Sequence, residues 1–515
     1  MSPLKRNLLI ITVLLAAVME LIDATIVNVA LSYMGGNLGA TIEDTSWIVT
    51  SYSIANVIII PMTSFLSAKL GRRNYYIGSI VIFTVCSVMC GLSHNIWTLV
   101  FFRFVQGLGG GALLSVSQAV IFEQFPKEKQ ATAGAIFGIG VFLGPTVGPT
   151  LGGWIVEYFS WPWIFYVNIP VGILAVISCY ILLTEPTHKP SVTKIDWMGI
   201  ALLAIGIGTL QTVLERGETE DWFSTPYITW FTIISILSLT AFVIWELKIR
   251  HPVVNLQVFR SKTLSIAALL TFITGVGLYT SIFLVPIIAQ RLLGFTPLQT
   301  GLMLFPAALL AVPVLVVTGK LMQKGLKPVF IVAVGFCSFI YFNWHLAHMN
   351  LDVSSGYFAI TMIFRSVGMA LLTVPLTTLA VSTLDPKDIP QGAALNNMMR
   401  QLGGSFGISI FDTYVTRRAA VHRTDLISHI TIGDPQVTDR INNMTLYFQD
   451  KGATFFDAHA KAIGLLNAQV VKQTSILSYL DAYFLLGSLF VLTMPLLLFV
   501  KTRKKLAAGT VISDH

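Results

Sequence analysis

Charged residues are scarce in this chain. Asp, Glu, Lys and Arg make up 11% of its 515 residues, whereas 54% are hydrophobic and the mean hydropathy is +0.75. A soluble protein usually carries about 25% charged residues, so this composition excludes an aqueous domain with a single core. The apolar runs are also too long for the strands of a membrane barrel. The sequence therefore predicts an all-α integral membrane protein, because a helix satisfies its own backbone hydrogen bonds in lipid.

Cysteine is rare, and the common sequence patterns of enzymes are missing. The four cysteines lie inside apolar runs, which favours packing over a disulfide framework or a metal site. We find no phosphate-binding G-x-x-x-x-G-K-[ST] loop, no H-E-x-x-H zinc motif and no nucleophile elbow. We therefore expect no enzyme, no metal and no cofactor, and no ATP-driven step within this chain. The net charge of +8 is spread over short clusters, so we expect no nucleic-acid partner.

What the chain has instead is a series of long apolar runs. A helix needs about 20 apolar residues to cross the lipid bilayer, and fourteen spans are predicted, of which 198–213 is short. They cover residues 8–31, 47–66, 75–92, 97–122, 131–155, 163–183, 198–213, 227–249, 264–290, 299–322, 328–347, 356–380, 391–416 and 477–500.

Basic residues predict the orientation of these spans. Lys and Arg gather in alternate segments, such as 69–73 and 320–327, while the short segments between them hold only Arg216 and Arg291. By the positive-inside rule both termini are cytoplasmic, in a bacterial inner membrane. One outer segment, 417–476, is long and polar, and residues 455–472 in it could form an amphipathic helix. It is either a solvated cap or a docking surface for a partner.

The chain also contains a weak internal repeat. Arg103 and Arg365 lie 262 residues apart, and Gly144 and Gly407 lie 263 apart. A near-constant offset indicates a duplicated half, which is a frequent design among transporters. We predict an N-terminal six-helix half at 1–190, a two-helix insert with its flanking loops at 191–262, and a C-terminal six-helix half at 263–515 that includes the outer segment.

Ionisable side chains inside the spans mark the candidate site, since a charge at mid-bilayer costs about 2.5–3.5 kcal/mol. Asp23 lies about 22 Å from the inner end of its span and Arg103 about 9 Å from the outer end, so both reach a similar depth. Glu20 shares a helix face with Asp23. Carboxylates beside a permanently charged arginine can exchange a proton. The alternative is a structural ion pair between two helices.

The fifth span carries Gly140, Gly144, Gly148 and Gly152 at four-residue intervals, interleaved with prolines. The glycines form a smooth stripe that permits close helix contact, and proline removes backbone donors and favours a bend. Static packing and a pivot between the halves both fit this pattern.

Five segments carry a resemblance to a known family. They are L-I-D-A-T-I-V-N-V-A-L (Leu21–Leu31), R-F-V-Q-G (Arg103–Gly107), G-P-T-V-G-P-T-L-G-G (Gly144–Gly153), W-P-W-I-F-Y-V-N-I-P-V-G (Trp161–Gly172) and Q-G-A-A-L-N-N-M-M-R-Q-L-G-G-S-F-G (Gln391–Gly407). Together they resemble the major facilitator superfamily, in its fourteen-span drug:proton antiporter branch, and are most similar to the EmrB-type multidrug exporters. The resemblance covers essentially the whole chain.

The resemblance implies a major facilitator fold of two six-helix halves plus a two-helix insert, working by alternating access. It implies proton coupling at Asp23, with Glu20 and Arg103 beside it. It also implies three further groups of residues. The antiporter motif comprises Gly144, Pro145, Gly148, Pro149, Gly152 and Gly153; the conformational loop comprises Lys69, Gly71, Arg72 and Arg73; the substrate cavity comprises Asn28, Gln106, Gln118, Arg365, Asn396 and Arg400. The loop departs from the family where Ala68 replaces the usual aspartate, which removes the acid that pairs with its basic residues.

The implied function is the export of hydrophobic or amphiphilic small molecules in exchange for protons, as in multidrug efflux and drug resistance. The implied partners are small hydrophobic drugs, protons and the lipid bilayer, with an EmrA-like periplasmic adaptor and an outer-membrane channel as a further expectation. A proton-coupled uptake or metabolite transporter of the same fold is the alternative. A membrane-embedded enzyme or sensor is the third and weakest hypothesis.

Overall fold

The computed structural model describes residues 2–126, 129–184, 196–249, 252–350, 353, 355–382, 384–385, 388–431 and 434–499. Regular structure in this part of the chain is helical. The N-terminal half comprises α1 (Pro3–Leu38), α2 (Ile42–Leu70), α3 (Arg72–Gly91), α4 (Ile96–Glu123), α5 (Gln130–Tyr158), the short α6 (Trp163–Tyr166) and α7 (Asn168–Leu182). The insert comprises α8 (Trp197–Arg216), η2 (Trp222–Ser224), α9 (Pro226–Lys248) and η3 (Leu256–Arg260).

The C-terminal half comprises α10 (Lys262–Ile287), its π-helical continuation η4 (Ile288–Leu292), α11 (Pro297–Gln323), α12 (Pro328–Ala347), α13 (Ser355–Ser382), α14 (Ile389–Ser428), α15 (Pro435–Asp450), α16 (Phe455–Thr493) and η5 (Met494–Phe499). Side-chain caps start many of these helices, as expected for exposed backbone N–H groups at helix ends. Asn95 caps α4 in this way, and Thr296 with Gln299 forms a capping box on α11.

The fourteen predicted spans coincide with helices, which confirms the all-α membrane fold. Within the described residues, thirteen helices are long and apolar enough to cross a membrane, counting the short α6 with α7 and including α8, whose run had been predicted as short. The remaining predicted span, 391–416, falls on α14. This helix carries too many polar side chains to meet that criterion. Gln391, Asn397 and Arg400 are examples, and they are buried inside the bundle.

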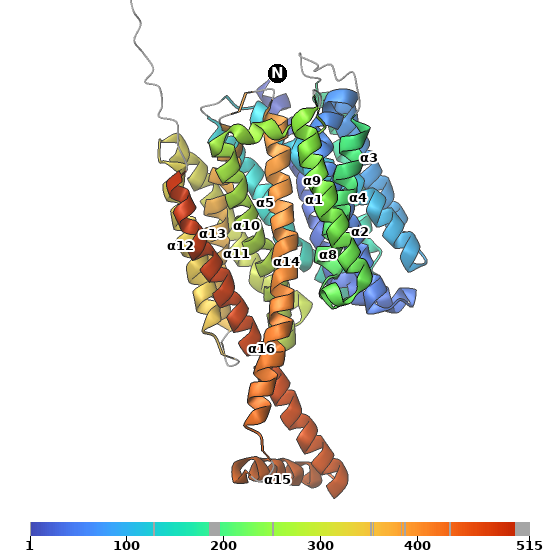
Figure 1. Cartoon of the computed structure of the whole chain (residues 1–515), viewed down its shortest axis with the longest axis vertical. Helices are drawn as coiled ribbons and strands as arrows, with labels where there is room; N and C mark the ends of the chain where they lie inside the picture. The colour runs from blue at the N-terminus through green and yellow to red at the C-terminus, as the bar shows by residue number, and fades with distance from the viewer. Residues whose placement is uncertain are drawn as a thin grey trace, which may run out of the picture.

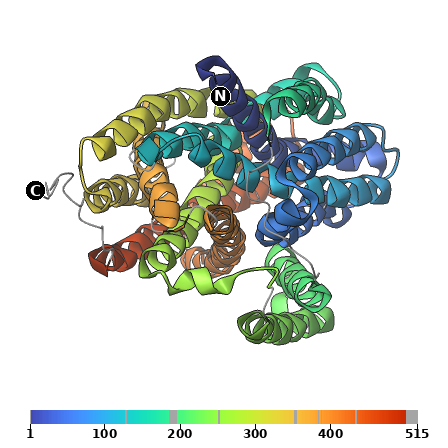
Figure 2. The same ribbon diagram turned by 90° about the horizontal axis from the view of Figure 1, so that it is seen from above.

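The helices are arranged as two packed groups with a peripheral hairpin. In Figure 2 the N-terminal helices lie on one side and the C-terminal helices on the other, with α8 and α9 at the edge. α5 is the main contact between the groups: a β-carbon on Gly301 of α11 would touch Thr150, and one on Gly319 would touch Ala135. The domain boundary predicted at 190 and 191 lies outside the described residues.

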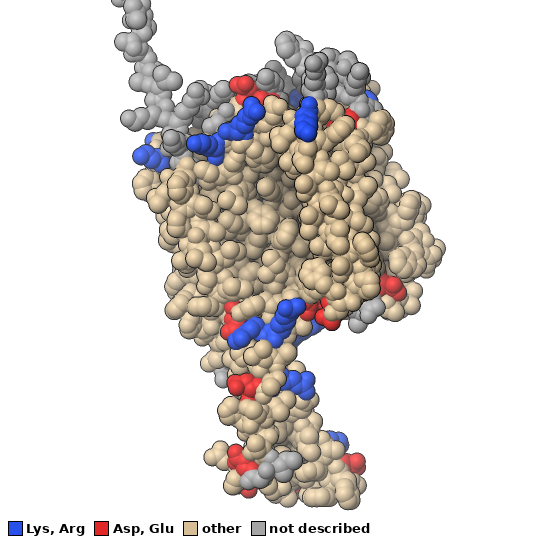
Figure 3. Space-filling view, in the orientation of Figure 1, with Lys and Arg blue, Asp and Glu red and all other residues tan. Residues whose placement is uncertain are grey.

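Charged side chains mark the two ends of the bundle. Figure 3 shows Lys, Arg, Asp and Glu at the top, at the bottom and on a projection below, with an uncharged belt between them. Large apolar side chains such as Leu174, Ile181 and Leu237 are exposed on this belt, as expected for a surface in contact with lipid. The C-terminal tail, predicted to be cytoplasmic, lies outside the described residues.

The outer segment 417–476 is helical rather than a loop. α14 continues beyond the bundle to Ser428, α16 begins at Phe455 and runs back into it, and α15 lies across their ends (Figure 1). We call this projection, residues 417–431 and 434–476, the stalk. The sequence predicted a helix only at 455–472. The difference arises because both spans continue into the stalk without a helix-breaking residue, so the helices persist past the last apolar turn.

Candidate functional site

Asp23 and Arg103 form a fully buried ion pair, as the depth argument predicted. Arg103 Nη1 donates to Asp23 Oδ2 at 2.6 Å, and both side chains have no exposed surface. The arginine is also held by contacts that do not depend on charge: Nε donates to the Ile48 carbonyl at 3.4 Å, and the guanidinium lies 4.1 Å from the centroid of the Tyr52 ring. A buried arginine needs such partners, because an unpaired charge in the membrane is costly.

The second oxygen of Asp23 is occupied by two amides. Asn168 Nδ2 donates to Oδ1 at 2.7 Å and Gln106 Nε2 donates at 3.2 Å. Gln106 Oε1 in turn accepts a bond of 2.9 Å from Arg103. The carboxylate thus connects α1 with α4 and α7. Gln106 had been predicted to face the substrate cavity, but the structure places it in this ion-pair network.

Glu20 lies apart from this network, although it is one turn from Asp23. Its Oε1 accepts from Asn56 Nδ2 at 2.9 Å and from the Tyr52 hydroxyl at 3.3 Å, whereas Oε2 has no partner in the described structure. Glu20 therefore contacts α2, while Asp23 contacts α4 and α7. Tyr52 touches both sets, because its ring lies under Arg103 and its hydroxyl binds Glu20.

The sequence analysis missed Asn168, Tyr52 and Asn56. Asn168 stood in a segment quoted for its family resemblance, and an amide inside an apolar span is the signal that could have identified it. Tyr52 and Asn56 occur in the polar second span one turn apart, which places them on one helix face. Neither pattern predicts its partner, since the contact depends on how α1, α2 and α7 pack.

The antiporter motif lies against α1. β-carbons placed on Gly144 and Gly152 would come within 2.5 Å of Leu21 and 2.8 Å of Ile26, and one on Gly148 would collide with Thr25. The predicted close contact of the glycine stripe is therefore present. Gly153 is buried beside it. α5 is one uninterrupted helix that includes Pro145 and Pro149, and the pivot remains a prediction.

The conformational loop connects the ends of α2 and α3 to neighbouring helices. Gly71 has φ of 84°, a backbone conformation that favours glycine. Arg72 Nη1 donates to Glu123 Oε2 at 2.5 Å, and Arg73 donates to the Tyr180 carbonyl at 2.6 Å. Lys69 lies in the last turn of α2. Glu123 at the end of α4 thus supplies a carboxylate partner near the position where Ala68 replaces the family's aspartate.

The other residues predicted for the substrate cavity occupy different environments. Gln118 and Asn396 are fully buried, and within the described structure their amide atoms have no hydrogen-bond partner. Arg400 of α14 donates to Asn397, whose Nδ2 reaches Ser115 of α4 at 3.4 Å and so bridges the halves.

Arg365 and Asn28 lie away from that contact. Arg365 Nη1 donates to Ser281 of α10 at 3.3 Å within the C-terminal half. Ser281 lies 258 residues after Asp23. In the C-terminal half a serine therefore lies near the position that corresponds to Asp23 in the internal repeat. Asn28 is exposed on α1.

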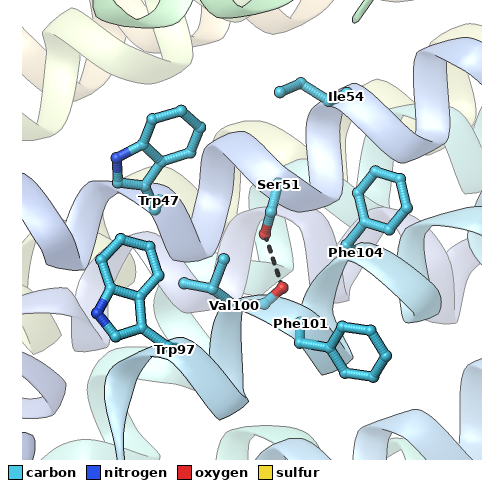
Figure 4. A pocket seen from close by; sticks show the side chains of 7 residues that line it. All are labelled: Trp47, Ser51, Ile54, Trp97, Val100, Phe101 and Phe104. Atoms are coloured by element: carbon cyan, nitrogen blue, oxygen red, sulfur yellow. Dashed lines mark hydrogen bonds between the residues drawn. The ribbon is translucent and has the colours of Figure 1, made fainter. Parts of the chain in front are cut away.

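A pocket on the N-terminal half is almost wholly apolar (Figure 4). Two tryptophans and two phenylalanines line it together with aliphatic side chains of α2 and α4, and it contains none of the predicted cavity residues. Its one hydroxyl, Ser51 Oγ, donates to the Val100 carbonyl at 3.2 Å. The other polar side-chain atoms of the lining are the indole nitrogens of Trp47 and Trp97. Within the described residues no group of three or more His, Cys, Asp or Glu could hold a metal.

Comparisons with known proteins identify a family and several relatives of the chain. The family model described as Major Facilitator Superfamily matches residues 13–408. Fatty acid resistance protein FarB of Neisseria gonorrhoeae is 31% identical over 95% of this chain and 94% of its own length. Multidrug export protein EmrB of Escherichia coli K12 is 30% identical over 95% of this chain and 94% of its own.

Solved structures share the fold at low sequence identity. The human organic anion transporter MFSD10 (TETRAN) has a TM-score of 0.60 at 13% identity, covering 96% of this chain and 100% of its own. The proton:xylose symporter XylE has a TM-score of 0.60 at 13% identity, covering 97% of both chains.

Proposed function

The chain belongs to the major facilitator superfamily, and we propose that it exports hydrophobic or amphiphilic small molecules across the bacterial inner membrane in exchange for protons. It is a multi-pass transporter and not an enzyme. Its similarity to a multidrug export protein and to a fatty acid resistance protein, each over 95% of the chain, supports this substrate class. One proton crossing the membrane provides about 2.3 kcal/mol per 100 mV, which is a useful driving force.

The observation that carries this proposal is the buried Asp23 carboxylate. It is the negative member of an ion pair with no exposed surface, and it connects three helices of the N-terminal half. Protonation of Asp23 would remove the charge attraction between α1 and α4. Arg103 would keep Gln106, the Ile48 carbonyl and the Tyr52 ring as partners. Proton binding can therefore weaken the attachment of α1 to α4 while Arg103 keeps its other contacts.

The contact between α1 and α5 supports transmission of this change. The glycines of the antiporter motif lie directly against the α1 segment that carries Asp23, with Leu21 and Thr25 on either side of it. A shift of α1 would therefore reach α5, which packs on α11 and α13 of the other half. Glu20, with one carboxylate oxygen unpartnered, is the second candidate proton carrier.

The stalk is the proposed seat of an EmrA-like periplasmic adaptor, which would lead to an outer-membrane channel. Exposed apolar side chains gather on it: Phe456 is 83% exposed, and Leu446, Tyr447 and Phe455 are also exposed. In this proposal the stalk lies in the periplasm and the N-terminus in the cytoplasm.

Everted membrane vesicles test the function. We expect an energised membrane to drive a dye substrate into the vesicles, and addition of substrate to release part of the pH gradient. Asp23→Asn should abolish substrate-induced proton movement but still insert into the membrane. Asp44→Asn, at the start of α2 with its side chain bonded to Thr41, is the matched control. Unchanged coupling in Asp23→Asn would refute the proton site, and substrate movement in the opposite direction would indicate an uptake transporter.

A further inference from the structure

Two carboxylates lie buried together at the base of the insert, far along the chain from the proposed transport site. Asp196 caps α8 and is 5% exposed. Its Oδ1 accepts from the Gly199 backbone N–H at 2.9 Å and from Trp245 Nε1 of α9 at 2.9 Å. This oxygen therefore has two hydrogen-bond donors, and it connects the start of α8 to the end of α9.

Glu246 is the second member and is 1% exposed. Its Oε2 accepts from the Val254 N–H at 3.4 Å. Val254 belongs to the segment that leads into α10 and is itself 1% exposed. The two acids therefore hold three parts together: the start of α8, the end of α9 and the linker to the C-terminal half.

Each carboxylate has one oxygen without a hydrogen-bond partner in the described structure, Asp196 Oδ2 and Glu246 Oε1. Both oxygens face the same small space. A β-carbon on Gly199 would collide with both of them, so only a residue without a side chain fits between them.

Among the residues that the structure describes, no positive charge acts on Glu246 or forms an ion pair with either acid. From α9 and the linker the groups that act on Glu246 are the Asp196 carboxylate and the Val253 and Val254 N–H groups. The ion pairs of the described residues do not include either acid. α2 contacts α8 further along the helix, at Gly208, through the uncharged side chains of Ile54 and Ile58.

Two ionised carboxylates cannot share such a site at low cost, because like charges out of water repel strongly. A divalent cation would need about six or more oxygen ligands, and within the described residues no third acidic, histidine or cysteine ligand is near. A proton needs only the two bare oxygens. We propose that Asp196 and Glu246 form a proton-binding carboxyl pair, which holds one proton in the space between Asp196 Oδ2 and Glu246 Oε1.

The pair makes the attachment of the insert depend on pH. With one proton bound, the net charge is a single negative one, and the donors on the other two oxygens stabilise it. Loss of that proton leaves two facing negative charges, which push α8 and α9 apart at their base. Stability therefore falls as the pH rises from about 4, where the carboxyls of an unfolded chain ionise, to the pH at which the folded pair releases the shared proton, and it is level above that. This proton does not cross the membrane and is separate from the one proposed for Asp23.

Infrared difference spectroscopy of the full chain in lipid nanodiscs at neutral pH tests the site. We expect Glu246→Gln to lose one protonated-carboxyl band relative to the unchanged protein. Glu220→Gln, whose carboxylate pairs with Arg216, should lose an ionised-carboxylate band instead. Loss of only an ionised band in Glu246→Gln would overturn the proposal. A band that shifts when sodium or potassium replaces choline would indicate a metal cation in place of the proton.

Thermal unfolding provides a second test that does not need the acids to be replaced. The unchanged protein should lose thermal stability from mildly acidic to alkaline pH, until the shared proton is released, whereas Asp196→Asn should show a flatter profile, because only one ionisable group remains. Gly199→Ala inserts a methyl group between the bare oxygens. At neutral pH this variant should therefore be as unstable as the unchanged protein is at alkaline pH. Equal pH profiles in all three proteins would refute the shared proton.

Discussion

At the scale of single residues, the candidate site consists of two acids with different surroundings. Asp23 accepts hydrogen bonds at both oxygens from charged and neutral donors, whereas Glu20 uses one oxygen only. The depth argument was sufficient to predict that Asp23 and Arg103 meet. It was not sufficient for Asn168, because the partner of a buried amide depends on how three helices pack and not on spacing within one of them.

Asn168 provides a prediction at this scale. A hydrogen bond to a charged group contributes about 1.5–3 kcal/mol, so Asn168→Ala should reduce proton-driven exchange about tenfold or more. Proteoliposome transport under an imposed pH gradient measures this. Ser87→Ala is the control, since Ser87 Oγ accepts a second bond of 3.0 Å from the same Asn168 Nδ2 and does not touch Asp23. Equal losses in the two variants would argue for packing alone.

At the scale of helices, the contact between α1 and α5 connects the proposed proton site to the interface between the halves. The four-residue glycine spacing predicted a close helix contact, and the structure has one. The sequence could not predict which helix would lie against the stripe, because every neighbouring span is equally apolar. The assignment to α1 follows from the residues that fill the grooves at Gly144, Gly148 and Gly152.

Gly148→Ala tests this contact. The added methyl group would collide with Thr25, and α1 and α5 would have to separate, so we expect transport to fall at least tenfold while the protein still inserts. Thr25→Ala in the same chain removes the colliding atom and should restore part of the activity. Gly78→Ala on α3, which has open space around it, should behave like the unchanged protein. Absence of rescue would contradict the proposed contact.

The insert also bridges the halves at the helix scale. Gln211 of α8 donates to Ser405 of α14 at 2.8 Å, and Arg216 of α8 donates to Ser46 of α2 at 2.5 Å. α2 and α14 belong to different halves, so α8 restrains their separation at this end. The internal repeat located the insert in the chain, but it contains no information about these contacts.

Gln211→Leu should weaken this restraint by about 1 kcal/mol. We expect a several-fold larger population of conformations in which α2 and α14 are separated, measured as a distance distribution between spin labels on these two helices. Thr209→Ala is the control, because Thr209 bonds only to carbonyls of its own helix. An unchanged distribution in Gln211→Leu would show that α8 does not restrain the halves.

At the scale of the whole molecule, hydropathy predicted fourteen spans, and the internal repeat and the family resemblance predicted two halves with an insert; the all-helical membrane fold agrees with this. The sequence analysis predicted too little helix in the stalk, because hydropathy detects lipid contact and not helix length. α14 and α16 leave the apolar region and remain helical. Their contact at the base of the stalk includes Asp481, which accepts from Arg418 and His422 at 2.5 and 2.8 Å.

Shortening the stalk separates its role from transport itself. Replacement of the segment that includes α15 by a short flexible linker should leave transport in proteoliposomes unchanged and should lower drug resistance in cells, because only the cell needs the adaptor. The two measurements are uptake by proteoliposomes and growth in the presence of drug. Equal loss in both would mean that the stalk stabilises the membrane domain and does not recruit a partner.

α14 is a single continuous helix, with one end in the transporter and the other in the stalk. From Arg400 to Ser428 it extends about 42 Å at the usual helical rise. A tilt of about 10° around Arg400 would therefore swing the far end by about 7 Å. Alternation of the membrane domain would thus be amplified mechanically at the tip, so that a protein seated there would be pushed once in every transport cycle.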